Sequence, residues 1–292
     1  MLLEHLKNIN RVSQTNYDRS KFLRLDKNER NFPFSKKTIK EIKKLVSNQV
    51  LQTYQSTTKN LVSLISKKEK IEERYINVIP GSDSGIKYFF EIFSGGNKPA
   101  AATIYPTYGM VEVYAKIYKY RLIKINDKNI NIKKLFNNKL SFIYIANPNQ
   151  PSGKLVQEKV IFDIIKKARN RNIFVLLDEA YIDFSKFKSI SSYIKKFHNL
   201  IILKTFSKSY GLAGLRIGYF IAHKKLNKII NSVRPTFDVS HFSIKVAEYF
   251  LMNKQIRNSY IHEVKKSKKF LINECKKRNL KYIDTETNFF YI

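Results

Sequence analysis

The chain has 292 residues, a net charge of +32 and a hydrophobic fraction of 43%, which is typical of a folded protein with a sizeable core. No apolar run approaches the roughly eighteen residues that a membrane span needs. Glu4 and Lys7 interrupt the segment where a secretory signal would need an apolar core. One cysteine, Cys275, excludes an intrachain disulfide and leaves no metal cluster to propose. We therefore expect a cytoplasmic protein with no membrane contact and no bound metal.

The positive charge has two interpretations. One is binding to nucleic acid or to a membrane surface. The other is compositional drift, because Lys, Asn, Ile and Tyr are all abundant. The lysines are scattered along the chain, and short runs such as residues 263–269 resemble solvated helix faces. This distribution favours drift, so we expect no nucleic-acid partner, although the field would attract anionic substrates.

Apolar residues at helical spacing predict helices at Lys36–Ser47 and Leu61–Lys70, after an irregular amino-terminal arm. Beyond them, short apolar runs alternate mostly with helix-like segments and indicate buried strands. The expected strands are Tyr75–Ile79, Ala101–Tyr105, Leu140–Ala146, Ile173–Leu177, Leu200–Leu203 and Ile217–Ile221. The alternation predicts an α/β fold of three layers, α/β/α, with a mostly parallel sheet. Ligands bind beyond the strand ends of such sheets.

Two helical stretches follow Ser240, at His241–Leu251 and Tyr260–Arg278, and two short strand candidates come last, at Lys281–Ile283 and Asn288–Ile292. The chain stops on a strand, without the elements that would complete a layer. We therefore expect an arm that begins a small domain at 1–35, a large domain at 36–239, and part of a smaller α/β domain at 240–292. Apolar surface on the helices after Ser240 should then be uncovered.

Two turns after expected strands carry small or aromatic residues. The sequence Gly-Ser-Asp-Ser-Gly at 81–85 follows a strand and opens a helix, so its free backbone N–H groups form an anion cradle. Small residues also cap many helices for purely structural reasons. Tyr108 follows the next strand and is placed to stack on a flat ligand, although ordinary packing explains a single tyrosine equally well.

A rigid polar turn, Asn-Pro-Asn-Gln-Pro-Ser-Gly at 147–153, comes directly after an apolar strand. Its prolines and glycine fix the backbone and leave the side chains of Asn149 and Gln150 free to hydrogen-bond, unless the segment is only a turn. Asp178 stands at the end of the following apolar strand. A carboxylate there is costly unless it is paired, so we interpret Asp178 as functional.

The most informative stretch runs from Lys204 to Tyr219. It combines the hydroxyls of Thr205 and Ser207 with Lys208, a glycine-bearing loop, and Arg216 ahead of another apolar strand. Hydroxyls beside an arginine suit a phosphate, and a lysine in a partly desolvated site can form a Schiff base. A basic surface loop would explain the lysine and arginine but not the full pattern.

With these motifs, the chain resembles the fold-type I pyridoxal-phosphate enzymes, specifically the class I and II aminotransferases, and most closely their histidinol-phosphate aminotransferase branch. The resemblance runs from Leu25 to Phe289, nearly the whole chain. Its most specific parts are DEAY-x-DF, beginning at Asp178, and TFSK-x-x-GLAGLRIGY, beginning at Thr205, which occur in this order about thirty residues apart.

The resemblance implies pyridoxal 5'-phosphate bound as a Schiff base on Lys208, which would also move a proton during catalysis. Asp178 would pair with the pyridine nitrogen, Tyr181 would hydrogen-bond the phenolic oxygen, and Tyr108 would stack on the ring. The implied catalytic residues are Lys208, Asp178 and Tyr181. The implied cofactor-binding residues are Tyr54, Ser82, Asp83, Ser84, Tyr108, Asn149, Gln150, Asp178, Tyr181, Thr205, Ser207, Lys208 and Arg216.

Tyr54 lies where the family sends a tyrosine to the phosphate of the neighbouring subunit, which implies a homodimer. The other implied partners are a small-molecule amino donor and a 2-oxo acid. Several positions depart from the family pattern. Gln150 replaces an asparagine, Ser84 replaces a glutamate, and the Asn-Glu-Asn-Pro-Tyr signature is altered from Asn28 to Pro33. The family also continues for several dozen residues beyond this sequence, and that part carries the arginine that binds the substrate carboxylate.

The leading hypothesis is an aminotransferase acting on an amino acid or an amino-phosphate such as histidinol phosphate. The second is a decarboxylase of the phosphothreonine type, because the same cofactor chemistry releases CO₂ when the substrate is oriented differently. The third is a truncated homologue that binds the cofactor with little activity. The fourth, a nucleic-acid binder, would show strongly salt-dependent binding.

Overall fold

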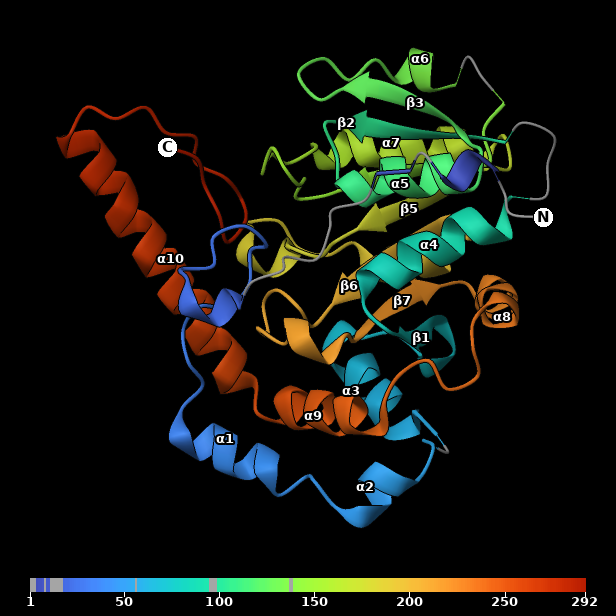
Figure 1. The fold of residues 1–292 in the computed structure, drawn as a ribbon. Coiled ribbons are helices and arrows are strands. Elements are labelled where there is room, and N and C mark those ends of the chain that lie inside the picture. Colours follow the sequence, from blue (N-terminus) through green and yellow to red (C-terminus); the bar gives the residue numbers. More distant parts are fainter. Residues whose placement is uncertain (1–3, 8, 11–17, 56, 95–98, 137–138) are drawn as a thin grey trace.

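The computed structural model describes residues 4–7, 9–10, 18–55, 57–94, 99–136 and 139–292. A seven-stranded sheet forms its centre, with strands in the order β1-β7-β6-β5-β4-β2-β3 (Figure 1). The strands are β1 (Ile76–Ile79), β2 (Ala100–Tyr105), β3 (Arg121–Asn126), β4 (Phe142–Ala146), β5 (Phe174–Asp178), β6 (Leu200–Thr205) and β7 (Gly218–Ala222). All neighbours pair in parallel except β7, which is antiparallel to both β1 and β6.

Helices cover both faces of the sheet (Figure 1). Their bounds are α1 (Lys36–Lys43), α2 (Asn48–Gln52), α3 (Lys59–Glu69), α4 (Ser82–Ile92), α5 (Gly109–Ile117), α6 (Ile132–Leu135), α7 (Glu158–Arg169), α8 (Lys224–Val233), α9 (His241–Met252) and α10 (Lys254–Lys277). Apolar side chains of α3, α7 and α9 join one buried cluster, and those of α4, α5 and α8 join another on the opposite face. The expected three-layer α/β/α architecture is confirmed.

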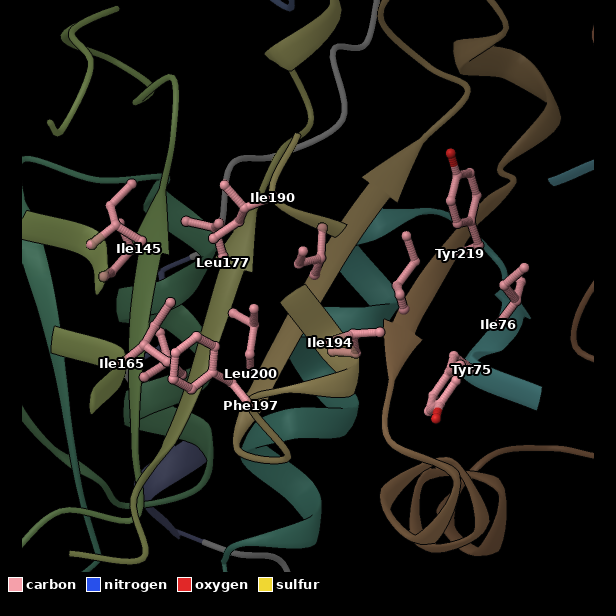
Figure 2. Close-up of a cluster of buried hydrophobic side chains, with 14 of the residues drawn as sticks. Tyr75, Ile76, Ile145, Ile165, Leu177, Ile190, Ile194, Phe197, Leu200 and Tyr219 are labelled. Atoms are coloured by element: carbon pink, nitrogen blue, oxygen red, sulfur yellow. The ribbon is translucent and has the colours of Figure 1, made fainter. Parts of the chain in front are cut away.

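The cluster beneath α3, α7 and α9 is built from the alternate side chains of the central strands. Figure 2 shows Ile145 of β4, Leu177 of β5 and Leu200 of β6 in this cluster, together with Ile194 and Phe197 from the segment before β6. Parallel strands buried on both faces need such continuous apolar runs, because neither face is solvated. Because of this requirement, the central strands can be predicted from continuous apolar runs in the sequence.

Two expectations need correction. β3 was not expected, because its residues alternate between apolar side chains and charged ones such as Lys124, as they do in an edge strand. The two strands expected at the end of the chain do not form. Only an isolated bridge joins Ile283 to Tyr291 there, since the described residues place no third strand beside this pair to extend the ladder.

The helices after Ser240 behave differently from each other. α9 begins at a cap formed by the Ser240 hydroxyl, which accepts a hydrogen bond from the Ser243 N–H, and it packs against α3 in the main core. α10 extends along one side of the molecule, beside the amino-terminal arm (Figure 1). As expected, apolar side chains are uncovered on both helices: Met252 of α9 is 63% exposed and Phe270 of α10 is 62% exposed. No described helix has the length and apolarity needed to cross a membrane.

Candidate active site

A cleft of about 900 Å³ lies at the carboxyl ends of β4, β5 and β6. The amino-terminal arm (residues 19–30), the start of α4, the turn before α5 and the loops after these three strands line it. Carboxyl ends of parallel strands meet at one edge of a sheet, which is where ligands bind in open α/β folds. Most of the site residues expected from separate motifs line this cleft, whereas Tyr54, Ser84, Asn149 and Thr205 do not. The sheet topology brings the lining residues together.

Asp178 ends β5 and is buried at the base of the cleft. One carboxylate oxygen accepts the hydroxyl hydrogen of Tyr144 at 2.8 Å, and the other accepts the N–H of Ala180 at 2.9 Å. Burial raises the pKa of Asp178 to about 6, although these two hydrogen bonds and Lys208 lower it. A cationic partner in the cleft would therefore stabilise the ionised form of the Asp178 carboxylate.

Lys208 lies on the loop after β6, and its Nζ donates to the carbonyl of Lys27 at 2.9 Å. Its ammonium is also 5.3 Å from the ring centroid of Tyr181. Burial lowers the pKa of Lys208 to about 8, and Arg216 lowers it further while Glu29 and Asp178 raise it. The amine is therefore more often neutral at physiological pH than an ordinary lysine, as a nucleophile or a general base requires.

An anion cradle lies beside Lys208. Gly81 caps the start of α4 at a φ of +83°, and no side chain caps this helix end. A Cβ at Gly81 would stand 3.0 Å from Nη2 of Arg216, so the guanidinium lies directly over this backbone. The Ser207 hydroxyl is 3.5 Å from Nη1 of Arg216, and Thr205 accepts the Ser207 N–H at 3.1 Å. Amides, hydroxyls and a guanidinium together suit a phosphate.

Tyr181 is fixed by two amide side chains. Its hydroxyl donates to Oε1 of Gln150 at 2.9 Å and accepts from Nδ2 of Asn28 at 3.0 Å. Gln150 thus lines the cleft beside Tyr181, and its contact with the phenolic oxygen of the cofactor stays a prediction. Burial raises the pKa of Tyr181 well above its ordinary value, so the hydroxyl keeps its proton.

Some of the remaining expected residues line the cleft, and others lie outside its lining. Tyr108, Ser82 and Asp83 line the cleft, and Asp83 accepts the hydroxyl hydrogen of Tyr114 at 3.0 Å. Asn149 and Ser84 are not among the lining residues. The Asn149 side chain donates to the Pro106 carbonyl at 2.8 Å, and the Ser84 hydroxyl donates to the Pro80 carbonyl at 3.2 Å.

Tyr54 lies away from the cleft of its own chain. Its side chain is 78% exposed and stacks on Phe237, with ring centroids 4.6 Å apart. It follows the short helix α2, and it is not among the residues that line the cleft.

Sequence reasoning missed several residues of the site. Tyr144 is an interior residue of a buried strand, with no turn to mark it. Arg19, Arg24 and Glu29 of the arm line the cleft, and Glu29 pairs with the two arginines at 3.0 and 3.4 Å. The arm has no periodic pattern, so only the tertiary structure shows that it closes the cleft.

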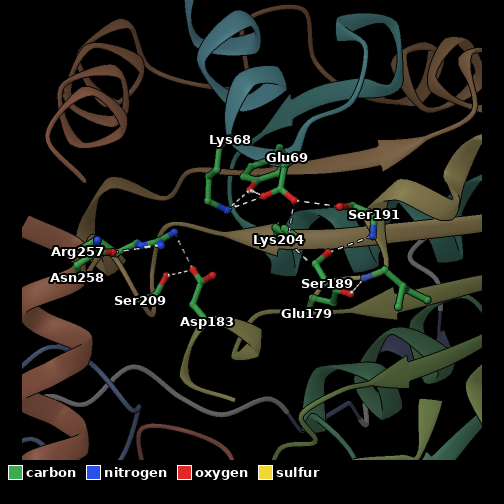
Figure 3. A network of polar contacts seen from close by, with 12 residues as sticks. Lys68, Glu69, Glu179, Asp183, Ser189, Ser191, Lys204, Ser209, Arg257 and Asn258 are labelled. Atoms are coloured by element: carbon green, nitrogen blue, oxygen red, sulfur yellow. Dashed lines mark hydrogen bonds and ion pairs between the residues drawn. The ribbon is translucent and has the colours of Figure 1, made fainter. Parts of the chain in front are cut away.

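Behind the cleft lies a buried charge cluster, drawn in Figure 3. Lys204 pairs with Glu69 at 3.0 Å and with Glu179 at 3.2 Å, and all three side chains are at most 6% exposed. Tyr219 and Ser191 also donate to Glu69. Burial disfavours the charged forms of Glu69 and Lys204, but the attraction between opposite charges outweighs this effect. The pKa of Glu69 is therefore lowered and that of Lys204 is raised.

This buried charge cluster holds the strand ends that carry the site. Glu179 directly follows Asp178, the last residue of β5, and Lys204 precedes Thr205 on β6. The two ion pairs of Lys204 therefore join the ends of these strands to each other and to Glu69 at the end of α3. A second contact joins the loop after β5 to α10, because Asp183 accepts from Ser209 at 2.6 Å and lies 3.6 Å from Arg257 (Figure 3).

Comparisons with known proteins agree with this geometry. The family model described as aminotransferase class I and II matches residues 20–292. A histidinol-phosphate aminotransferase of Buchnera aphidicola subsp. Diuraphis noxia is 32% identical over 244 residues, covering 80% of this chain and 67% of the relative. One from Clostridium beijerinckii is 28% identical over 280 residues, covering 93% and 76%.

A solved structure has the same fold. The histidinol-phosphate aminotransferase from Sinorhizobium meliloti in complex with pyridoxal-5'-phosphate superimposes with a TM-score of 0.81 at 19% identity, covering 90% of this chain and 73% of that one.

Proposed function

This chain belongs to the class I and II aminotransferases, which depend on pyridoxal phosphate, and we propose that it moves the amino group of an amino acid or an amino-phosphate to a 2-oxo acid. Histidinol phosphate is the amino donor that the names of its relatives suggest. The cofactor phosphate would occupy the cradle around Arg216, so the support for a phosphorylated or acidic substrate comes from the arginines of the arm, Arg19 and Arg24, which line the same cleft.

The described residues fit pyridoxal phosphate. The cradle at Gly81 offers helix amides and Arg216 to a phosphate, and an added Cβ there would fill the space. At the base of the cleft, Asp178 has a raised pKa and gains from a protonated ring nitrogen. Lys208 supplies an amine with a lowered pKa. When bound, pyridoxal phosphate supplies an electron sink for the substrate carbon that loses its proton.

The protein side of the reaction follows from these positions. In the proposed site, Arg216, Ser207 and the start of α4 hold the phosphate, and Tyr108 covers the ring. Asp178 would hold the proton on the ring nitrogen. The Tyr181 hydroxyl would bind the phenolic oxygen by turning toward it the hydrogen that it donates to Gln150, while Asn28 still donates to Tyr181. Lys208 in its neutral form accepts the proton from the substrate carbon. The amino-terminal arm excludes water from the cleft.

The observation that carries the proposal is a half-buried lysine of lowered pKa in the same cleft as Asp178 and the anion cradle. The test supplies the purified protein with pyridoxal phosphate, 2-oxoglutarate and one of two amino donors, histidinol phosphate or phosphothreonine, and measures glutamate and CO₂. Glutamate formation from histidinol phosphate at the rate of its consumption is expected. CO₂ release from phosphothreonine without glutamate would identify a decarboxylase instead, and no product with either donor would contradict the proposal.

Replacing Asp178 by asparagine should leave the cofactor bound, although more weakly, while turnover falls by roughly a hundredfold or more, as when a preorganised electrostatic partner is removed. The asparagine still accepts the Ala180 N–H but no longer carries the charge that keeps the ring nitrogen protonated. Steady-state turnover and the cofactor dissociation constant check this prediction. Near-normal turnover in the variant would mean that Asp178 is structural.

We also propose a homodimer in which Tyr54 reaches the phosphate of the neighbouring subunit. The exposure of Tyr54 and its distance from the cleft of its own chain support this arrangement. Tyr54→Phe keeps the ring that stacks on Phe237 and removes only the hydroxyl. We expect cofactor affinity to fall about fivefold, the worth of one hydrogen bond.

The matched control for this variant is Tyr193→Phe, which changes another partly exposed tyrosine that packs edge-on against Phe162. It should leave cofactor affinity unchanged. Sedimentation and cofactor titration over a range of protein concentrations complete the test, because affinity should fall on dilution if the site is shared. A monomer that binds the cofactor tightly would contradict the shared site.

The chain division that we propose has a larger domain at 36–239 and a smaller one built from residues 1–35 and 240–292. The contacts of the described part of the arm with the carboxyl-terminal region support this division. Arg30 lies 4.4 Å from the ring centroid of Tyr260, and Asn288 donates to the Asn28 carbonyl at 3.1 Å. We propose a cytoplasmic location, which the single cysteine in 292 residues supports.

A further inference from the structure

Tyr144 is a buried residue of β4 that the sequence motifs did not mark. Its side chain is 1% exposed, and its ring packs in the cluster that contains Phe142, Ala146 and Leu176. A phenylalanine would fill the same apolar space. Tyr144 nevertheless contributes to the lining of the cleft, so the feature that needs explanation is its hydroxyl.

The sheet register aims this hydroxyl at Asp178. Ala146 of β4 pairs directly with Asp178 of β5, and Tyr144 is two residues before Ala146. Residues two apart on a strand point to the same face, so Tyr144 and Asp178 lie diagonally on one face of the sheet. The hydroxyl donates to Oδ2 of Asp178 at 2.8 Å.

Several other groups act on Asp178. The Ala180 N–H donates to Oδ1 at 2.9 Å, Lys208 attracts the negative charge, and Glu179 repels it. The rings of Tyr108 and Tyr181 also lie close enough for Asp178 to affect their pKa values. Burial raises the pKa of Asp178, and among these partners the hydrogen bond from Tyr144 lowers that pKa most. The pKa of Tyr144 itself is raised by burial and then by Asp178, so Tyr144 remains a donor across the working pH range.

We propose that Tyr144 is a positioning residue for the cofactor site: its hydroxyl keeps Asp178 ionised and fixes the rotation in which this carboxylate meets the ring nitrogen. With one donor on each oxygen, the carboxylate is held at two points, and its remaining lone pairs face the cleft. The proposal rests on the proposed role of Asp178 in binding the ring.

The test compares Tyr144→Phe with the matched variant Tyr120→Phe. Tyr120 packs in the same buried cluster, but its hydroxyl donates to the Phe90 carbonyl at 3.1 Å and not to Asp178. Both variants lose one buried tyrosine hydrogen bond, so they should lose similar stability. Only Tyr144→Phe should change the proton affinity of Asp178.

The probe is pyridoxine 5'-phosphate, which carries an alcohol in place of the aldehyde and therefore binds without covalent capture by Lys208. Its dissociation constant is measured between about pH 5 and pH 8 on protein free of cofactor. Binding a protonated ring requires an ionised Asp178, so affinity should fall as the pH falls through the pKa of Asp178, which is about 6 in the free protein.

Without the Tyr144 hydroxyl, the pKa of Asp178 should rise by about one unit, the usual effect of losing one hydrogen bond to a charged group. The loss of affinity should then begin about one pH unit higher, and Tyr144→Phe should bind up to about tenfold more weakly than wild type at the acid end. Tyr120→Phe should follow the wild-type curve. If Tyr144→Phe also follows it, or if both variants shift equally, the proposal is wrong.

The double variant Tyr144→Phe with Asp178→Asn separates this proposal from the one it rests on. Asparagine has no carboxylate to titrate, so the tyrosine substitution should shift nothing in that background. An Asp178→Asn variant with the wild-type pH curve would overturn the role of Asp178 itself. A changed curve in Asp178→Asn but not in Tyr144→Phe would overturn only the role of Tyr144.

Discussion

Replacing Lys208 by alanine is expected to reduce amino transfer by at least roughly 10⁴-fold, because general acid–base catalysis alone contributes about 10²–10⁴ and we propose that this lysine also attaches the cofactor. Lys208 is the amine with a lowered pKa among the residues that line the cleft. The variant should still bind the cofactor through the cradle around Arg216. Steady-state turnover and cofactor titration measure the two effects separately.

The control for this variant is Lys186→Ala, which removes an exposed lysine that pairs with Glu286 at 3.3 Å. It should keep wild-type turnover, since an exposed ion pair contributes little. Lys208→Ala with more than about 1% of wild-type turnover would show that another group moves the proton, and the site would need a different base.

Replacing Lys204 by methionine is expected to lower the free energy of unfolding by about 3–5 kcal/mol, the usual effect of removing one partner from a buried ion pair. Glu69 and Glu179 would lose their shared cation, and both are at most 4% exposed. Methionine has a similar length, so the change removes mainly the charge. Urea unfolding of the cofactor-free protein measures the effect.

Two further variants make this result specific. Lys186→Met removes the exposed pair with Glu286 and should change stability by at most about 1 kcal/mol. Adding Glu179→Gln to Lys204→Met should restore part of the loss, because Glu179 is then no longer a buried charge without its cation, while Glu69 keeps its ion pair with Lys68 at 2.5 Å. An unchanged unfolding curve for Lys204→Met would show that the buried charge cluster does not hold the strand ends.

The sequence predicts those parts of the fold in which local pattern and burial agree. The central strands are apolar on both faces, so their runs stand out, and Ser240 marks the start of α9 with a local cap. β3 lies at the edge, where alternating side chains weaken the signal. The antiparallel direction of β7 depends on where the chain returns to the sheet, which no local pattern reveals.

The site residues also fall into those that the local sequence marks and those that only the tertiary structure reveals. Asp178 and Lys208 could be predicted because a carboxylate after an apolar strand and a lysine in a hydroxyl-rich loop are locally unusual. Tyr144 and Asn28 could not, since each acts through a partner distant in sequence: Tyr144 through Asp178 and Asn28 through Tyr181. Such contacts are fixed by sheet register and by the course of the arm.

Borohydride reduction tests directly the proposed attachment of the cofactor to Lys208. The protein with bound pyridoxal phosphate should absorb in the visible region, and reduction should abolish that band and fix the cofactor to one peptide. Mass spectrometry should find the label on the peptide that contains Lys208, and Lys208→Ala should stay unlabelled. A label on any other lysine of the wild-type protein, or no visible band with excess cofactor, would contradict this attachment.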